Sequence, residues 1–214
     1  LVEPQYIEEF KKRALRPEAP ICKVGAQNGD VYFQGRETSN KYYDAVPDIV
    51  QEYMDKVAQV TGRQYHPFDY VGAPDATDVI VAMGSGCEAI EETIEYLNSV
   101  QGKKYGLVKV RLYRPFDVKR FNEALPKSVK RIAVLDRTKE PGSIGEPLYL
   151  DVVAALENKE IRVIGGRYGL SSKEFTPSMI LAIFKHSEAN GFHGFTVGIN
   201  DDVTNKSLKV EETI

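Results

Sequence analysis

A glycine-rich turn at Gly84–Gly86 has the residue types that could bind a phosphate. The turn follows an apolar run and precedes apolar residues at helical spacing, within the stretch VAMGSGCEAIEETIEYL (81–97). Where a strand, such a turn and a helix follow one another, backbone N–H groups at the helix N-terminus can bind an anion. The alternative is that the turn is only a corner between a strand and a helix.

The residues around the turn favour the structural alternative. Ser85 and Glu88 have the spacing of a capping box, in which the Ser85 hydroxyl accepts a hydrogen bond from the Glu88 amide and the Glu88 carboxylate bonds back to the cap. Glu88, Glu91 and Glu92 add negative charge to the first two turns, which repels a phosphate. A Walker lysine and the complete GxGxxG pattern are missing. We therefore predict that Gly84–Gly86 is a corner and not an anion site.

Two further segments carry polar residues where a ligand could bind. Asp136, Arg137, Lys139 and Glu140 lie in LDRTKEPGSIGEPLY (135–149), at the predicted C-terminal end of a strand, where open α/β sheets place ligands. The segment GGRYGLSSKEFTP also lies at the predicted C-terminal end of a strand, and its loop covers 165–175. Ser172 or Thr176 could cap the helix that follows. Each segment either contacts a ligand, another domain or a subunit, or is a charged loop whose glycines and prolines set turns.

Histidine and cysteine offer little further chemistry. His66, His186 and His193 share no metal-ligand spacing and no neighbouring carboxylate pattern, so we expect neither catalysis nor metal binding from them. GxSxG and a Ser-His-Asp order are also missing. The two cysteines, Cys22 and Cys87, are far apart and form no CxxC, which excludes a zinc ribbon or an iron–sulfur cluster built from this segment alone. Reduced thiols and a cytoplasmic location are the expectation.

Composition is that of an ordinary globular protein. Of 214 residues, 42% are hydrophobic and 28% are charged, and the net charge of −3 does not favour binding to nucleic acid or to an anionic membrane. The sequence lacks an apolar run of about 20 residues and a signal-peptide pattern, so we expect no membrane association. The chain begins Leu1-Val2-Glu3 without an initiator methionine. We therefore expect a piece of a longer polypeptide.

The elements that must position these residues alternate regularly after residue 76. Apolar segments predict strands over 78–84, 105–113, 131–136, 161–166 and 194–199, and the intervening segments predict helices over 86–100, 117–125, 147–157 and 176–187. Strands that alternate with helices indicate βαβ units with right-handed crossovers. We predict an open, doubly wound α/β fold with a mainly parallel five-stranded sheet and helices on both faces.

The first 75 residues predict a partial segment of helix and loop. A short helix over 4–15 is ended by Arg16-Pro17, residues 26–47 have the composition of an ordered loop, and a second helix runs from Pro47 to Thr61 with Gly62 as its stop. So little sheet makes a poor independent domain. We expect this half to pack against something else, through aromatic residues that include Tyr32, Phe33, Tyr42 and Tyr43.

Taken together, motifs spread from about residue 15 to residue 208 resemble the pyruvate:ferredoxin (flavodoxin) oxidoreductase family. They are DVYFQGRE, AVPDIVQEYM, TGRQYHPFDYVGAPDA, KVRLYRPF, VLDRTKEPG, GEPLYLDV, GRYGLSSKEF and FTVGINDDVT. Any one of them alone is weak, whereas their joint occurrence is highly specific.

The resemblance implies a segment of a large, usually homodimeric enzyme that converts pyruvate and coenzyme A to acetyl-CoA and CO2. In that family the reaction uses thiamine pyrophosphate, magnesium and [4Fe–4S] clusters, and electrons pass to ferredoxin or flavodoxin. Residues 1–75 would be the tail of the thiamine-side first domain, 76–200 a second domain like the C-terminal domain of transketolase, and 201–214 a linker toward a third domain.

The resemblance carries over no functional residue. Thiamine and cluster motifs of the family find no match here, so we expect no catalytic, cofactor-binding or metal residue in this segment, which would be a structural and interface module. Two alternatives stay open: a stand-alone nucleotide- or coenzyme-binding α/β protein that uses the loops 135–149 and 165–175, and a separate assembly subunit of an oxoacid oxidoreductase. Which of ferredoxin and flavodoxin accepts the electrons is also open.

Overall fold

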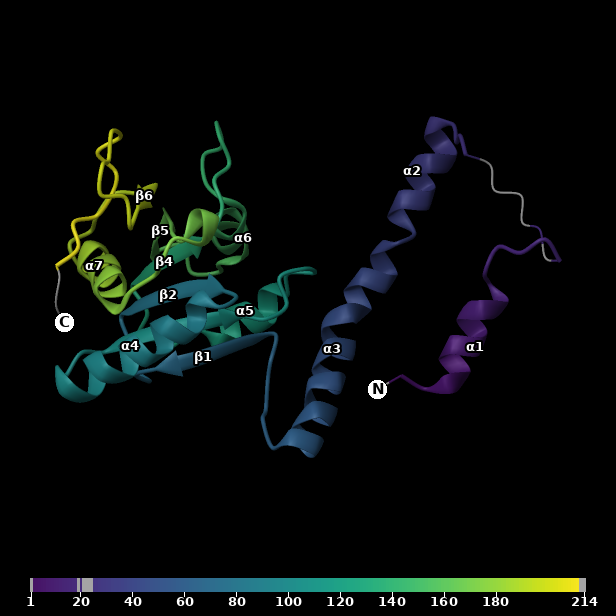
Figure 1. Ribbon diagram of the computed structural model, residues 1–214, viewed down its shortest axis with the longest axis horizontal. Coiled ribbons are helices and arrows are strands. Elements are labelled where there is room, and N and C mark those ends of the chain that lie inside the picture. The colour runs from purple at the N-terminus through teal and green to yellow at the C-terminus, as the bar shows by residue number, and fades with distance from the viewer. Residues whose placement is uncertain (1, 19, 21–24, 212–214) are drawn as a thin grey trace. The chain divides into compact units, whose positions relative to one another are not determined.

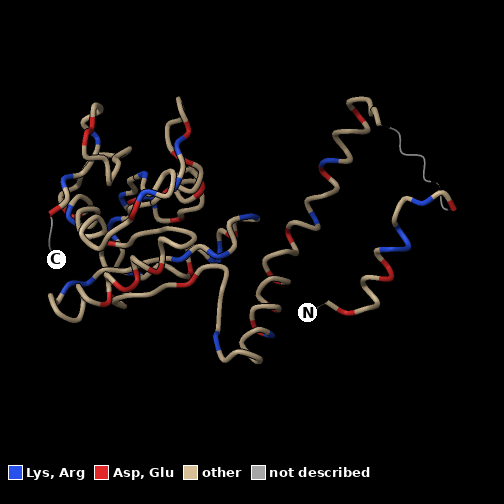
Figure 2. Tube along the Cα trace, in the orientation of Figure 1, with Lys and Arg blue, Asp and Glu red and all other residues tan. Residues whose placement is uncertain are grey.

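The computed structural model describes residues 2–18, 20 and 25–211 in two compact units, 1–42 and 43–214 (Figure 1). Cys22 lies outside the described residues. Acidic and basic residues alternate along the chain in both units, without a long run of one sign (Figure 2). None of the described helices is long and apolar enough to cross a membrane.

The first unit corrects the prediction of a loop over residues 26–47. It contains helices α1 (Pro4–Lys12) and α2 (Gly29–Glu37). The Asn28 side chain accepts a hydrogen bond from the Val31 amide and so caps α2, although asparagine and glycine in the sequence suggested turns. The hydroxyls of Thr38 and Ser39 then donate to backbone carbonyls of the last turn.

Helix α3 (Asn40–Thr61) also begins before the predicted position. Pro47 was expected in the first turn, where its missing N–H costs nothing, but it lies inside the helix and is buried. Gly62, with a φ of 72°, follows the last residue as predicted. The aromatic side chains of Tyr32, Phe33, Tyr42 and Tyr43 are all more than half exposed.

The second unit is an α/β structure built on a mostly parallel sheet of six strands in the order β1-β3-β2-β4-β5-β6. The strands are β1 (Phe68–Gly72), β2 (Asp78–Met83), β3 (Tyr105–Val110), β4 (Arg131–Asp136), β5 (Arg162–Arg167) and β6 (Phe195–Thr196). The last five lie within or close to the predicted strands, and these five pair with one another in parallel. The fold class is therefore confirmed.

Strand β1 is an addition that the sequence did not predict. It pairs antiparallel with β3, with Phe68 opposite Val110 and Gly72 opposite Gly106. At the other edge β6 is only two residues long. The chain returns beside it, because the Thr196 amide donates to the Lys206 carbonyl and the Leu208 amide donates to the Thr196 carbonyl.

Helices cover both faces of the sheet, as predicted. Alternate residues of each strand point to opposite faces, so Ile80 and Ala82 of β2 contribute to one core, and Val79 and Val81 contribute to the other. The first core is covered by α4 (Gly86–Val100) and α7 (Pro177–Glu188). The second is covered by α5 (Val118–Ala124) and α6 (Pro147–Ala155). Because β2 to β6 are parallel, their carboxyl ends meet at one edge of the sheet.

Candidate functional site

The strand order places a topological switch point between β2 and β4, where doubly wound sheets commonly bind ligands. Protein atoms occupy this place. The Arg137 side chain, which follows β4, donates from Nη1 to the Ser85 hydroxyl at 3.3 Å and from Nε to the Gly169 carbonyl at 2.7 Å. The guanidinium thereby connects the turns that follow three neighbouring strands.

Tyr168 closes the same crevice. Its side chain is only 3% exposed and belongs to the core on the α4 face. A Cβ atom on Gly86 would overlap the hydroxyl and ring of Tyr168. Glycine at position 86 therefore serves the close packing of an aromatic ring against the start of α4, rather than the approach of a phosphate.

The predicted capping box at Ser85 is wrong. Ser85 has helical dihedral angles, φ −61° and ψ −23°, and its side chain makes no capping hydrogen bond. The residue is already inside the turn, and its hydroxyl accepts from Arg137. The Glu88 carboxylate contacts Lys109 Nζ on β3 at 3.2 Å instead of the cap.

Lys109 also changes the charge argument for the turn. Its side chain is 7% exposed and pairs with both Glu88 and Glu91. Burial acts to lower the pKa of Lys109, but the hydrogen bonds to Glu91 and Glu88 raise it on balance, so the ammonium stays charged. The acid at the start of α4 is thus partly neutralised by a neighbouring strand.

A cavity of about 920 Å³ lies further along the same edge, and we call it the carboxyl-edge pocket. Its walls come from the segments 139–146, after β4, 167–173, at and after the end of β5, and 193–206, on both sides of β6. The first and the last of these project from the sheet, in teal-green and yellow respectively (Figure 1). The pocket therefore includes parts of both loops that the sequence indicated, 135–149 and 165–175.

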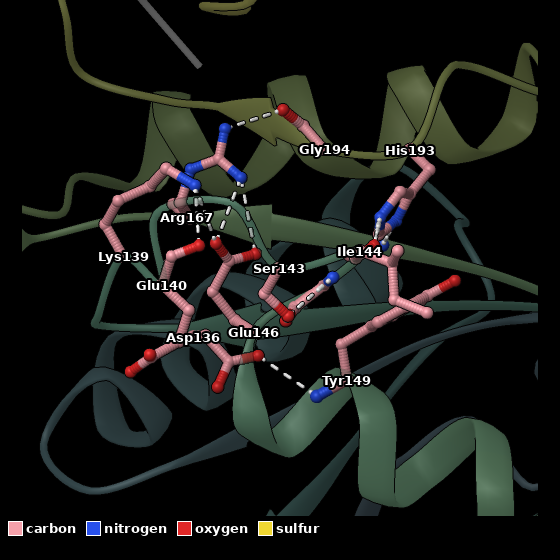
Figure 3. Close-up of polar contacts among 12 residues, drawn as sticks. Asp136, Lys139, Glu140, Ser143, Ile144, Glu146, Tyr149, Arg167, His193 and Gly194 are labelled. Atoms are coloured by element: carbon pink, nitrogen blue, oxygen red, sulfur yellow. Dashed lines mark hydrogen bonds and ion pairs between the residues drawn. The ribbon is translucent and has the colours of Figure 1, made fainter.

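An ion network of three residues forms the polar wall of the pocket (Figure 3). The Glu146 side chain is 3% exposed and both of its oxygens lie 3.3 Å from Arg167 Nη1. Lys139 Nζ approaches the same carboxylate at 3.5 Å. Arg167 is held further by a 2.8 Å bond from Nη2 to the Gly194 carbonyl. Two cations and one buried carboxylate leave a net positive charge here.

Asp136 does not face the pocket as a free acid. It is 1% exposed, and its two oxygens accept hydrogen bonds from the amides of Leu148 (2.9 Å) and Tyr149 (3.1 Å), in the first turn of α6 (Figure 3). Burial raises the pKa of Asp136, and these two hydrogen bonds oppose that effect only partly. Asp136 therefore orders the end of the 135–149 loop.

The four polar residues predicted around Asp136 thus have separate environments. Asp136 is buried, Arg137 reaches the switch point, and Lys139 lines the pocket. Glu140 contributes its backbone carbonyl, which accepts from Lys139 Nζ at 3.1 Å. In the second loop Thr176 caps α7 by accepting from the Met179 amide, whereas Ser172 lies in a short 3-10 turn with a positive φ of 60°.

His193 has a structural role at the rim of the pocket. Its Nδ1 accepts from the Gly165 amide at 3.0 Å, so Nε2 carries the proton and donates to the Ile144 carbonyl at 2.9 Å (Figure 3). His186 likewise contacts a carbonyl, that of Phe192. His66 has a carboxylate neighbour that the sequence pattern did not indicate, because its Nδ1 lies 2.8 Å from Asp69 Oδ1 on β1.

Sequence reasoning missed Glu146 and Arg167, the centre of the network. Each looked like part of a turn or a strand end, and their pairing depends on the parallel register of β4 and β5. The position of Glu146 directly before Pro147, the first residue of α6, was the available signal for a functional strand-to-helix loop.

The remaining cysteine and possible metal ligands add no reactive centre within the described residues. Cys87 is buried, and burial raises the pKa of its thiol to about 11, which disfavours a thiolate at neutral pH. Over residues 2–18, 20 and 25–211, no three His, Cys, Asp or Glu side chains come together as a metal site.

Comparison with known proteins adds a family to this geometry. Residues 76–180 match the family described as pyruvate:ferredoxin oxidoreductase core domain II. The chain is 58% identical to a pyruvate:ferredoxin oxidoreductase of Moorella thermoacetica, over 100% of this chain and 18% of the relative. It is 51% identical to a pyruvate dehydrogenase [NADP(+)] of Cryptosporidium parvum, over 96% of this chain and 11% of the relative.

A solved structure supports the fold. A 2-oxoglutarate:ferredoxin oxidoreductase from Magnetococcus marinus superimposes with a TM-score of 0.51, at 20% identity, over 78% of this chain and 25% of that one. The chain spans less than a fifth of the length of the Moorella relative. The alignment with that relative extends over the whole of this sequence, including the segments that build the carboxyl-edge pocket. The chain belongs to the pyruvate:ferredoxin oxidoreductase family.

Proposed function

We propose that this chain is a segment of an enzyme that oxidises pyruvate, with coenzyme A, to acetyl-CoA and CO2, and passes the electrons to ferredoxin or flavodoxin. The observation that carries the proposal is the 58% identity to the Moorella thermoacetica enzyme across the full length of this chain. The match of residues 76–180 to a core domain of that enzyme family supports it.

Within that enzyme the segment acts as a structural and interface module and supplies no catalytic residue. The crevice where doubly wound sheets usually bind a ligand is filled by Arg137 and Tyr168, which supports this role. Exposed aromatic residues on α2 and at the start of α3 are suited to burial against a neighbouring domain. The domain layout we propose is a first-domain tail over 1–75, a second domain over 76–200 and a linker over 201–214.

The cofactors of the reaction belong to other parts of the enzyme. An iron–sulfur cluster needs several thiolate ligands, and the described residues do not fit this need, because they include a single cysteine, the buried Cys87. We likewise assign the binding of thiamine pyrophosphate and magnesium to other parts of the enzyme. The parent enzyme is a homodimer in the cytoplasm in this proposal, in keeping with the reduced thiol of Cys87.

A domain exchange tests the proposal. This chain would replace the corresponding segment of the Moorella enzyme, and pyruvate-dependent reduction of a viologen dye would be measured with coenzyme A present. We expect the chimera to fold and to retain most of its activity. A chimera that folds and binds thiamine pyrophosphate normally, yet reduces no dye, would contradict the assignment of the module.

The chain by itself provides the matching control. We expect no pyruvate-dependent viologen reduction from the purified chain after treatment with iron, sulfide and thiamine pyrophosphate, because the catalytic groups lie elsewhere. Activity above the rate of a buffer blank would show that catalytic residues are present in this segment.

A further inference from the structure

We propose that the carboxyl-edge pocket binds a phosphate-bearing organic anion of about nucleotide size. Neither the family match nor the names of the relatives assign a ligand to this segment. The pocket is made entirely by the second unit, from loops at the ends of three adjacent parallel strands. Such loops are the usual ligand-binding part of an open α/β sheet.

Charge is the first argument. The residues that line the pocket include four cations, Lys139, Arg167, Lys173 and Lys206, and one carboxylate, Glu146, while Lys173 is paired with Glu174 outside the lining at 2.7 Å. The whole chain has a net charge of −3, so this local excess of positive charge runs against its composition. A concave site lined by one sign of charge concentrates ligands of the opposite sign.

Glu146 is the carboxylate in the pocket wall, and its position limits its effect on an anion. The carboxylate is 3% exposed and is in contact with both Arg167 and Lys139. The three groups together keep one net positive charge, which Glu146 reduces but does not cancel.

Hydrogen-bond donors are the second argument. Arg167 has five N–H groups, and in the described part of the chain its Nε–H and one N–H of Nη2 have no acceptor. Thr196 also lines the pocket, and its buried hydroxyl has no partner among the described residues. A phosphate has enough acceptor oxygens for all of these donors, and guanidinium groups bind phosphate in a paired geometry.

Size and wall composition are the third argument. A cavity of about 920 Å³ is too large for a lone inorganic ion and lies within the range of pockets for small organic ligands. Ile144, Leu170, Val197 and Ile199 supply apolar wall next to the cations. The ligand therefore has an organic body as well as a phosphate.

Calorimetric titration of the purified chain tests the proposal at fixed ionic strength. ADP, inorganic pyrophosphate and adenosine are the probes, since they separate the phosphate from the organic body. We expect ADP to bind more tightly than either of the other two. Equal affinity for ADP and pyrophosphate would overturn the organic part of the proposal, and absence of ADP binding at millimolar concentration would overturn it entirely.

Two substitutions in the ion network should change the affinity for ADP in opposite directions. Lys139→Gln removes a cation and should weaken ADP binding about fivefold, whereas Glu146→Gln removes the opposing charge and should tighten it by a similar factor. A purely structural role for Glu146 predicts weaker binding or no change. Thr196→Val, which keeps the side-chain shape, should weaken ADP binding by about threefold and leave the fold intact.

The matched control is Lys130→Gln, an exposed lysine directly before β4, at the opposite end of the strand that Lys139 follows. We expect no change in ADP affinity from this variant. An equal loss from Lys130→Gln and Lys139→Gln would mean that ADP responds only to overall charge, and that result would overturn the pocket as the site.

Discussion

Two regions of one sheet edge differ in how they use the ends of parallel strands. At the switch point between β2 and β4, Arg137 bridges Ser85 and Gly169, and the ring of Tyr168 packs on Gly86. Beyond β5, the loops diverge and leave the carboxyl-edge pocket. The comparison shows that a favourable topology does not make a site, because side chains decide whether the space at the strand ends is filled or open.

The largest change in stability is expected from removing the Tyr168 ring at the switch point. Tyr168→Ala removes a buried aromatic ring from the core on the α4 face and should lower the free energy of unfolding by about 3–5 kcal/mol. Urea denaturation followed by circular dichroism measures the change. A loss below about 1 kcal/mol would mean that the ring does not fill the crevice.

A smaller loss is expected from crowding the same contact. Gly86→Ala places a methyl group against the Tyr168 ring, which should cost about 1–3 kcal/mol although alanine favours a helix. Adding Tyr168→Phe removes the nearest atom, the hydroxyl, and should recover part of the loss. If the two substitutions were simply additive in a double-mutant cycle, Gly86 and Tyr168 would not be in contact.

Two carboxylates near the pocket should respond to pH with opposite signs. Hydrogen bonds from Thr204 and Ser207 lower the pKa of Asp202 to about 2, so its contribution to stability is present above its ordinary value of 3.8 and is lost as the pH falls toward 2. Burial raises the pKa of Asp136, so the cost of its ionised form is relieved as the pH falls through the raised value.

Stability measured against pH for Asp202→Asn and Asp136→Asn, each relative to the unaltered chain, tests this contrast. On acidification the advantage of the unaltered chain over Asp202→Asn should shrink, and its advantage over Asp136→Asn should grow. Parallel slopes for the two variants would contradict the assigned environments.

The smallest effect is expected at Ser85. A serine that caps a helix typically contributes about 1 kcal/mol, but Ser85 makes no capping bond and accepts only a 3.3 Å bond from Arg137. Ser85→Ala should therefore lower the free energy of unfolding by no more than about 0.5 kcal/mol. A loss of 1 kcal/mol or more would restore the capping box that the structure contradicts.

Local patterns predicted the framework of the second unit well. The apolar spacing of α4 and the apolar run of β4 gave both elements their observed bounds, since packing on the sheet agrees with the local preference. Strand β1 was missed because it is short, follows Pro67 and owes its pairing to the distant strand β3. Helix α2 was missed because Asn28 and the glycines of this segment suggest turns. Asn28 is instead the residue that caps the helix.

The sequence indicated where the candidate site lies but not which contacts form it. The loops after β4 and β5 were identified from their polar residues and their place at strand ends. The Glu146–Arg167 contact depends on sheet register. The third wall of the pocket comes from residues in and around β6, where the sequence predicted only a strand and a linker. The contacts of Ser85 with Arg137 and of Gly86 with Tyr168 likewise join residues that no local pattern connects to the turn.

The contrast between the filled crevice and the open pocket can be measured most directly by NMR. Backbone amide shifts of the isotope-labelled chain would be followed during titration with ADP. The account predicts that the largest shifts fall on Gly169, Gly194 and Thr196, with no significant change at Ser85 and Gly86. Largest shifts at Ser85 and Gly86, or no shift at either region, would contradict it.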